Sequence, residues 1–147
     1  MRFLCIQSVF RLSSALVATS LLTCTFTPTH AANVTLTATD TFGTSSFDTA
    51  GNWDDLAAPS AGNDYFTGNF GIRTPNNSAA PGVFAGDSLT INSGGTLITK
   101  HAFGATATIN QLNLAGGTIG ASTGTGGGAQ QMYTGTLSVT ANSTISL

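Results

Sequence analysis

The sequence predicts an all-β protein in which successive strands stack as the coils of a parallel β-helix, or solenoid. The first observation is a phrase that residues 88–147 contain three times: an apolar-x-apolar run, a turn of small residues, and Thr followed by Leu or Ile. The second is the period, because its leading residues Leu89, Leu112 and Leu137 lie 23 and 25 residues apart, as a repeat that forms one coil should. The third is that apolar residues follow period two, without helical periodicity beyond residue 31.

An antiparallel β-sandwich is the alternative all-β architecture. A sandwich more often shows unrelated strands at a spacing of about 8 to 12 residues, whereas here the same pattern returns once per longer period. In the β-helix the apolar residues of each phrase point inward and stack from coil to coil. The residues expected in this core are Leu89, Ile91, Leu97, Leu112, Leu114, Ile119, Leu137, Val139 and Ile145.

Residues 1–31 are expected to be a secretory signal peptide. Arg2 and Arg11 supply a positive segment, an apolar stretch of 13 residues follows, and Thr29-His-Ala31 places small residues at the cleavage positions. The apolar stretch is too short for a comfortable membrane span; an uncleaved N-terminal anchor is the alternative. We therefore expect an exported protein that is extracellular or lies at the cell surface, associated with the outer membrane.

Composition excludes several function classes. Both cysteines, Cys5 and Cys24, fall in the expected signal peptide, so the mature chain would have no disulfide or thiolate chemistry. The mature chain would then contain only two cations, Arg73 and Lys100, and six aspartates. Binding to a phosphate backbone or to an anionic membrane surface requires several cations, so both are excluded as partners. With 41% hydrophobic residues the chain is nevertheless expected to fold.

Residues 32–87 are expected to form an N-terminal cap and the first coils. Asn33–Asp40 alternates strictly, with Val34 and Leu36 on one face and threonines on the other, so it is predicted to be a strand. Thr41–Asp48 is expected to continue as a second extended piece.

Two loops and two short strands are predicted before the repeats begin. Residues 49–64 are rich in Gly, Asn and Asp, which predicts an ordered loop. Tyr65–Thr67 and Asn69–Arg73 have strand character. Residues 74–81 contain two prolines and two asparagines and are expected to form the second loop.

Residues 88–147 are expected to form the solenoid repeats. They contain no proline and only one formally charged residue, Lys100, which suits uninterrupted ladders of main-chain hydrogen bonds. The third phrase stops at Leu147 without a nearby charge, so an open β edge is expected there. Either the chain is a fragment of a longer protein, or this edge pairs with the β edge of a partner.

The phrase Leu-x-Ile/Leu/Val, Gly-Gly, Thr-Leu/Ile resembles the autotransporter-associated β-strand repeat of large bacterial exported proteins. Phe47–Trp53, followed by Ala58-Pro59 and Gly62–Asp64, is similar to the Asn-Trp segment that often opens passenger-like or PEP-CTERM-type surface proteins. The resemblance implies a right-handed β-helical stalk and brings no catalytic residues with it. The chain as given contains neither the C-terminal β-barrel nor the hydrophobic sorting tail of these proteins, so neither self-translocation nor sorting is expected from it.

Four aspartates within 17 residues, Asp48, Asp54, Asp55 and Asp64, are the candidate carboxylates for Ca²⁺. The alternating spacing of a dedicated calcium loop is missing, so we interpret them as turn and solvation residues and predict no metal site. The same acids are the candidates for a glycosidase pair. Since the repeats lack the titratable groups that acid–base catalysis requires, we predict no catalytic residues and no cofactor.

Trp53 and Tyr65 are the candidate ligand-contact residues, because together with Phe66 they would form an aromatic platform for a sugar. The alternative is that Trp53 plugs the end of the core. His101 is expected in an exposed turn. Gly124–Gly128 is interpreted as a flexible insertion, since the Lys-Ser/Thr of a phosphate-binding loop does not follow it.

The sequence therefore predicts a secreted or surface-exposed structural or adhesin-like module without catalytic activity. The expected partners are an extracellular glycan or another cell-surface protein. A carbohydrate-binding or polysaccharide-degrading β-helix fragment is the alternative function.

Overall fold

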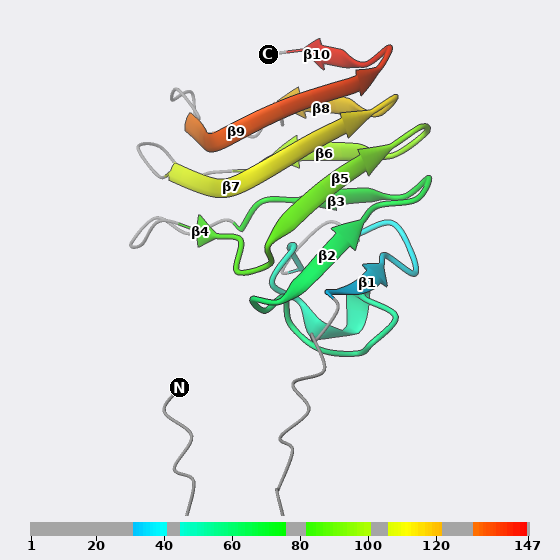
Figure 1. Cartoon of the computed structure of the whole chain (residues 1–147), viewed down its shortest axis with the longest axis vertical. Coiled ribbons are helices and arrows are strands. Elements are labelled where there is room, and N and C mark those ends of the chain that lie inside the picture. Colours follow the sequence, from blue (N-terminus) through cyan, green and yellow to red (C-terminus); the bar gives the residue numbers. More distant parts are fainter. Residues whose placement is uncertain (1–30, 41–44, 76–81, 101–105, 122–130, 147) are drawn as a thin grey trace, which may run out of the picture.

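The structure, a computed structural model, describes residues 31–40, 45–75, 82–100, 106–121 and 131–146 (Figure 1). These residues form strands and one short 3₁₀ helix, η1 (Ala50–Asn52), and include no α-helix. The all-β prediction is confirmed for this part of the chain. The predicted signal peptide lies outside it, apart from Ala31. No helix among the described residues is long and apolar enough to span a membrane.

The strands form two sheets. The first sheet has the order β1-β2-β5-β7-β4, and β9 also pairs with β7. β5 and β4 lie along one edge of β7 and β9 lies along its opposite edge. The second sheet has the order β10-β8-β6-β3. The strands of the first sheet are β1 (Ala32–Thr35), β2 (Asn63–Phe66), β4 (Gly82–Val83), β5 (Ser88–Asn92), β7 (Thr106–Ala115) and β9 (Gln131–Ala141). Those of the second are β3 (Gly71–Arg73), β6 (Thr96–Thr99), β8 (Thr118–Ala121) and β10 (Thr144–Ser146).

All ladders between these strands are parallel. Antiparallel pairing occurs among the described residues only as two isolated bridges, Leu36 with Trp53 and Asn92 with Gly116. The alternative prediction, an antiparallel β-sandwich, is therefore wrong.

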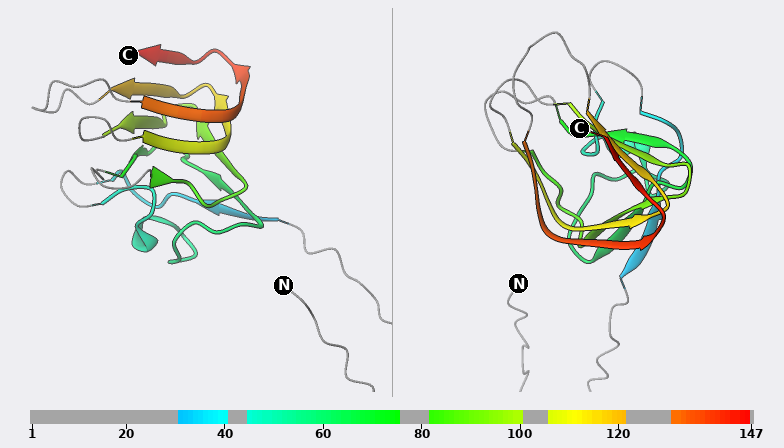
Figure 2. Two further views of the ribbon diagram at one scale, coloured as in Figure 1. Left: turned by 90° about the vertical axis from the view of Figure 1, so that its left-hand side faces the viewer. Right: turned by 90° about the horizontal axis from the view of Figure 1, so that it is seen from above.

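Each copy of the phrase contributes one strand to each sheet: β5 and β6 in the first copy, β7 and β8 in the second, β9 and β10 in the third. Leu89 pairs with Leu112, and Leu112 pairs with Leu137, so the leading residues of the three copies lie in register. Seen from above in Figure 2, β9 lies over β7 and the chain turns at the same corner toward β10 and β8. Residues far apart in the sequence thus become neighbours along each sheet.

The pairing register arranges the apolar side chains in three core rows that run across the strands. Two rows cross the first sheet and one crosses the second. The first row is Val34, Tyr65, Leu89, Leu112 and Leu137; the second is Ile91, Leu114 and Val139; the third is Ile72, Leu97, Ile119 and Ile145. Six of the nine predicted core residues are confirmed as buried, namely Leu89, Ile91, Leu97, Leu112, Leu114 and Ile119.

The other three predicted core residues are exposed, which corrects the prediction. The exposed fractions are 43% for Leu137, 58% for Val139 and 51% for Ile145. Each side chain continues a core row, but β9 and β10 are the last strands of their sheets in the described stack. A residue in a stacked row is buried when other parts of the chain cover it on both sides, as at Ile72 in the end strand β3, and none of the described residues covers the end formed by β9 and β10.

The Gly-Gly pair of the phrase forms the corner between the two sheets. The first glycine has a left-handed backbone, with φ of +81° at Gly94 and +91° at Gly116, a conformation that favours glycine. The second glycine has no room for a side chain. A Cβ at Gly95 would lie 2.3 Å from Thr67 Oγ1, and one at Gly117 would lie 2.3 Å from Ile91 Cγ2.

Gly117→Ala is expected to destabilise the protein by about 1–3 kcal/mol, because the added methyl group overpacks the corner. The nearest atoms include the carbonyl oxygens of Ile91 and Asn92, which belong to the main chain and cannot rotate away. Gly120→Ala is the matched control, since a Cβ there would meet nothing within 4 Å. Thermal unfolding followed by circular dichroism measures both, and equal melting temperatures for the two variants would contradict the close approach at the corner.

Residues 36–40 and 45–54, called the N-terminal segment below, follow β1 and bond its free edge at Thr35. Asp54 N donates to Thr35 O over 3.0 Å, and Thr37 N donates to Asn52 O over 2.9 Å. β1 is therefore shorter than the predicted strand Asn33–Asp40, because the chain leaves the ladder after Thr35.

The structure confirms only part of what the sequence predicts for residues 41–81. Of the extended piece predicted at Thr41–Asp48, the first four residues lie outside the described part, and residues 45–48 belong to no strand and include a turn at 47–48. The predicted loop 49–64 contains η1 and the start of β2. The strands expected at Tyr65–Thr67 and Asn69–Arg73 correspond to β2 and β3.

Candidate functional site

The two candidate ligand-contact residues lie in an aromatic cluster at the N-terminal end of the core. Trp53 and Tyr65 are both 0% exposed, and their rings meet edge to face with centroids 4.9 Å apart. Phe84 packs against Tyr65 and against Phe47, with centroid distances of 5.3 Å in both cases. This geometry is the favourable one for aromatic pairs.

The polar atoms of both candidate residues are used inside the cluster. Trp53 Nε1 donates to the carbonyl of Phe47 over 2.9 Å, and the hydroxyl of Tyr65 accepts a hydrogen bond from Ser60 N over 2.9 Å. A sugar-binding platform needs an exposed ring face, which neither ring has. A ligand contact at Trp53 or Tyr65 stays a prediction, which the burial of both rings does not support. The burial of Trp53 instead fits the alternative interpretation, a plug at the end of the core.

Three of the four candidate carboxylates each accept a hydrogen bond from a different group. Asp54 Oδ1 accepts from Thr35 N over 3.1 Å and Asp55 Oδ1 accepts from Ala57 N over 3.0 Å. Asp64 Oδ1 accepts from Ser88 Oγ over 2.5 Å. Partial burial raises the pKa of the Asp48 carboxyl. No group of three His, Cys, Asp or Glu side chains gathers within the described residues.

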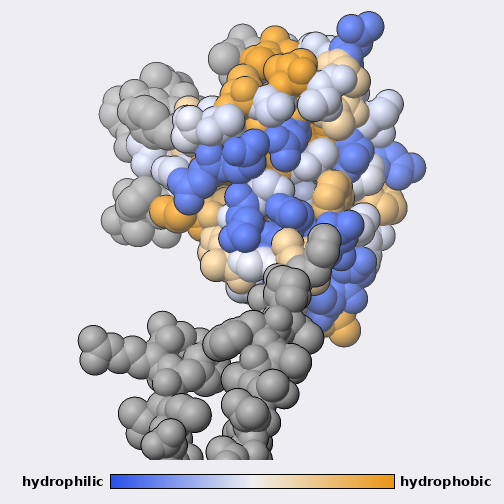
Figure 3. All heavy atoms as spheres, viewed as in Figure 1, coloured by the Kyte–Doolittle hydropathy of each residue, from blue (hydrophilic) through white to orange (hydrophobic). Residues whose placement is uncertain are grey.

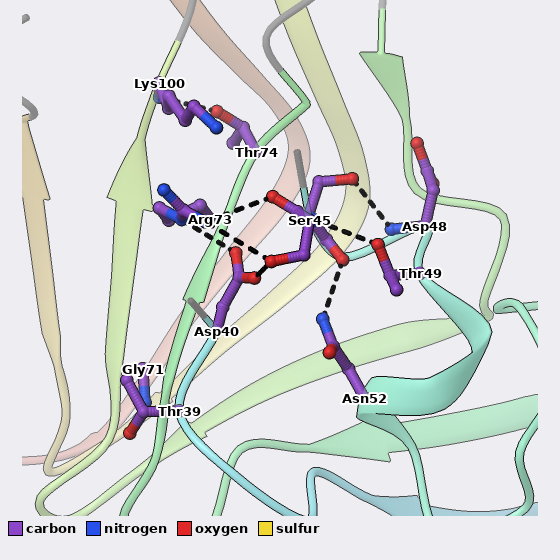
Figure 4. Close-up of polar contacts among 11 residues, drawn as sticks. Thr39, Asp40, Ser45, Asp48, Thr49, Asn52, Gly71, Arg73, Thr74 and Lys100 are labelled. Carbon is purple, nitrogen blue, oxygen red and sulfur yellow. Dashed lines mark hydrogen bonds and ion pairs between the residues drawn. The ribbon is translucent and has the colours of Figure 1, made fainter. Parts of the chain in front are cut away.

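A buried ion pair, which the sequence analysis did not predict, joins the N-terminal segment to the second sheet. Arg73 in β3 donates from Nε to Asp40 Oδ2 over 2.8 Å, and the side chains are only 3% and 1% exposed. Arg73 Nη2 also reaches the carbonyl and the hydroxyl of Ser45, both at 3.3 Å. The Ser45 hydroxyl in turn donates to Asp40 (Figure 4).

Lys100 lies near this pair, directly after β6. Its main-chain nitrogen donates to Thr74 Oγ1 over 2.7 Å. Burial, followed by the nearby positive charge of Arg73, lowers the pKa of its ammonium group. The two cations expected in the mature chain are thus close together in the fold, although 27 positions separate them in the sequence, from 73 to 100.

The polar groups of the Asp40–Arg73 cluster bind one another and hold two chain segments together, so we call the cluster a clamp. The serine, the carboxylate and the guanidinium group bind one another, and the described residues place no histidine beside Ser45 to act as a base. Arg73 has a planar set of donors that suits a buried carboxylate. The cluster therefore holds Asp40 and Ser45 against β3. One sequence signal points to it: Arg73 follows the apolar Ile72 in a strand otherwise free of charge.

Two further sequence-predicted features lie outside the described residues. These are His101 and the glycine-rich stretch Gly124–Gly128. Comparisons with known protein families, with curated proteins and with solved structures found no match for this chain.

Proposed function

We propose that this chain is a secreted or surface-exposed structural module, adhesin-like and without catalytic activity, built as a right-handed β-solenoid of the autotransporter-associated type. The observation that carries the proposal is the in-register stacking of three copies of one phrase in parallel ladders. A solenoid grows by adding such units to a continuous core. Its role is then to extend and to present a surface.

The side chains that face away from the core support a presenting role. Phe66, Thr90, Asn113 and Ser138 form an outer row across β2, β5, β7 and β9. Asn113 Nδ2 donates to Thr90 Oγ1 over 3.2 Å, so neighbouring coils bind each other on this side as well. Asn113 and Ser138 are partly exposed and Thr90 is buried, so this side of the sheet is polar and uncharged and offers no group for acid–base chemistry.

Surface exposure is tested on cells that produce the full chain with an epitope tag at its C-terminus. Export to the cell surface predicts labelling of intact cells by an antibody to the tag, and loss of labelling after brief treatment with an external protease. A variant with Leu12–Leu16 changed to a charged sequence is the matched control, because it removes the apolar part of the expected signal. Labelling only after permeabilisation would contradict the proposed location.

The absence of catalysis is tested with the purified full chain and a panel of polysaccharides. We expect no release of reducing ends over a day of incubation, while a known glycanase added to the same substrates serves as the positive control. Turnover of any glycan would overturn the non-catalytic proposal and favour the polysaccharide-degrading alternative. Saturable binding without turnover would instead identify an adhesin with a glycan partner.

A further inference from the structure

We propose that the free edge of β9 and β10 binds a second copy of this chain, so that two molecules join end to end about a two-fold axis. The proposal rests on the geometry of this edge alone, and it stands independently of the proposed location and of the lack of catalysis.

The first observation is an apolar surface at this end of the stack. Five large hydrophobic side chains of the described residues are exposed, and three of them, Leu137, Val139 and Ile145, belong to β9 and β10. Figure 3 shows hydrophobic residues gathered at the end of the molecule where these two strands lie in Figure 1. Such a gathering marks a contact surface, since singly scattered apolar residues are the normal pattern.

The second observation is an open hydrogen-bonding edge. β9 pairs only with β7 and β10 only with β8 among the described strands. Neither strand contains a charged residue or a proline, and these are the features by which proteins keep exposed edges from pairing. Two copies of this edge therefore approach each other without like-charge repulsion.

The third observation concerns the identity of the partner. Within the molecule, the strand that covers each phrase is another copy of the same phrase, as the pairing of Leu89 with Leu112 and of Leu112 with Leu137 shows. The chemistry that fits the end of the core rows is thus present in the chain itself. At the opposite end Asp54 N already donates to Thr35 O at the edge of β1, so we take the contact to join like ends.

Joining like ends defines the geometry of the pair. A two-fold axis normal to the first sheet at β9 keeps the core side of that sheet aligned in both copies and makes the two β9 strands antiparallel, which is an isologous contact. With the axis at Ser138, Leu137 of each copy faces Val139 of the other. Both core rows of the first sheet then continue across the contact, and side chains that are 43% and 58% exposed in one copy become covered.

Analytical ultracentrifugation of the full chain between about 1 and 200 μM tests the proposal. This range is chosen because a contact formed by two short strands of each copy is small and is expected to be weak. We expect the protein to shift from monomer to dimer over this range. Val139→Lys should weaken dimerisation at least ~10-fold by placing a charge in the contact. Val83→Lys is the matched control, because Val83 is 51% exposed in β4, away from the edge. A monomer throughout, or equal weakening by both variants, would overturn the proposal.

A cysteine cross-link tests the two-fold axis without relying on a destabilising change. In a Cys5→Ser/Cys24→Ser background, Ser138→Cys should form a disulfide-linked dimer under mild oxidation, because its two copies meet at the axis. Thr134→Cys is the control: four residues from the axis, its two copies would lie more than ~20 Å apart, too far for a disulfide. Equal cross-linking of both variants, or of neither, would contradict this arrangement, and oligomers larger than a dimer would contradict the two-fold contact.

Discussion

Leu112→Asp is expected to unfold the protein. Leu112 is fully buried and lies between Leu89 and Leu137 in the first core row. A carboxylate there would lose its hydration without gaining a cation, because the neighbouring core residues are apolar. We expect a loss of more than ~4 kcal/mol, which is exceptional for a single substitution and comparable with the total stability of many small domains.

The control for this change lies in the same row. Leu137→Asp introduces the same charge one strand further along, where the side chain is 43% exposed, so the carboxylate keeps much of its water. We expect a loss of about 1 kcal/mol or less. Urea unfolding at low protein concentration, where monomers dominate, measures both variants. Similar losses would contradict the view that a side chain in these rows is buried only where other residues cover it on both sides.

Asp40→Ala is expected to cost about 3–5 kcal/mol, since it leaves the buried guanidinium group of Arg73 without its carboxylate. The side chain of Arg73 is only 3% exposed, so water cannot replace the lost partner. The clamp also fastens Ser45, and the N-terminal segment should loosen with it. Faster hydrogen exchange at Asp40 N and Phe47 N, which donate to Gly71 O and Arg73 O, would report this loosening.

Asp55→Ala is the matched control for the ion pair. Asp55 is exposed and accepts one hydrogen bond, from Ala57 N. Removal of such a bond costs about 1 kcal/mol. If Asp40→Ala lowered the free energy of unfolding no more than Asp55→Ala does, the buried ion pair would contribute little to holding the N-terminal segment.

The strands of the repeats could be predicted because their pattern is local and recurs. Alternating apolar residues indicate which face of each strand is buried, and the recurrence of the phrase is sufficient to align Leu89 with Leu112 and Leu137, as the ladders do. The Gly-Gly pair recurs with the phrase, and its first residue has a local cause, because Gly116 adopts a positive φ. Its second residue, Gly117, lacks room for a side chain because Ile91 and Asn92 of the preceding copy lie against it.

The ion pair and the burial of the aromatic residues depend on long-range contacts, which a pattern does not reveal. Asp40 and Arg73 lie 33 positions apart, and no repeat relates them. The residue types of Trp53 and Tyr65 suit an exposed sugar-binding platform as well as a buried plug of the core. Only the meeting of their rings with Phe84, which comes from a later segment, distinguishes the two roles.

The exposure of Leu137, Val139 and Ile145 has a different cause. Their pattern is that of core residues, and their register in the sheets agrees with it. Burial, however, depends on a neighbour on the far side, and the pattern within one phrase carries no information about that neighbour. The same three residues therefore mark the end of the described stack and the surface that we propose for self-association.

The central claim, that successive copies of the phrase stack in parallel and in register, is tested most directly by paired cysteines in the Cys5→Ser/Cys24→Ser background. Thr90→Cys with Asn113→Cys places the two residues opposite each other on β5 and β7, about 4.8 Å apart and within disulfide range. We predict that this pair closes readily under mild oxidation. Thr90→Cys with Gln111→Cys, two residues out of register and beyond ~7 Å, should stay reduced. Closure of the second pair in preference to the first would contradict the register on which the account depends.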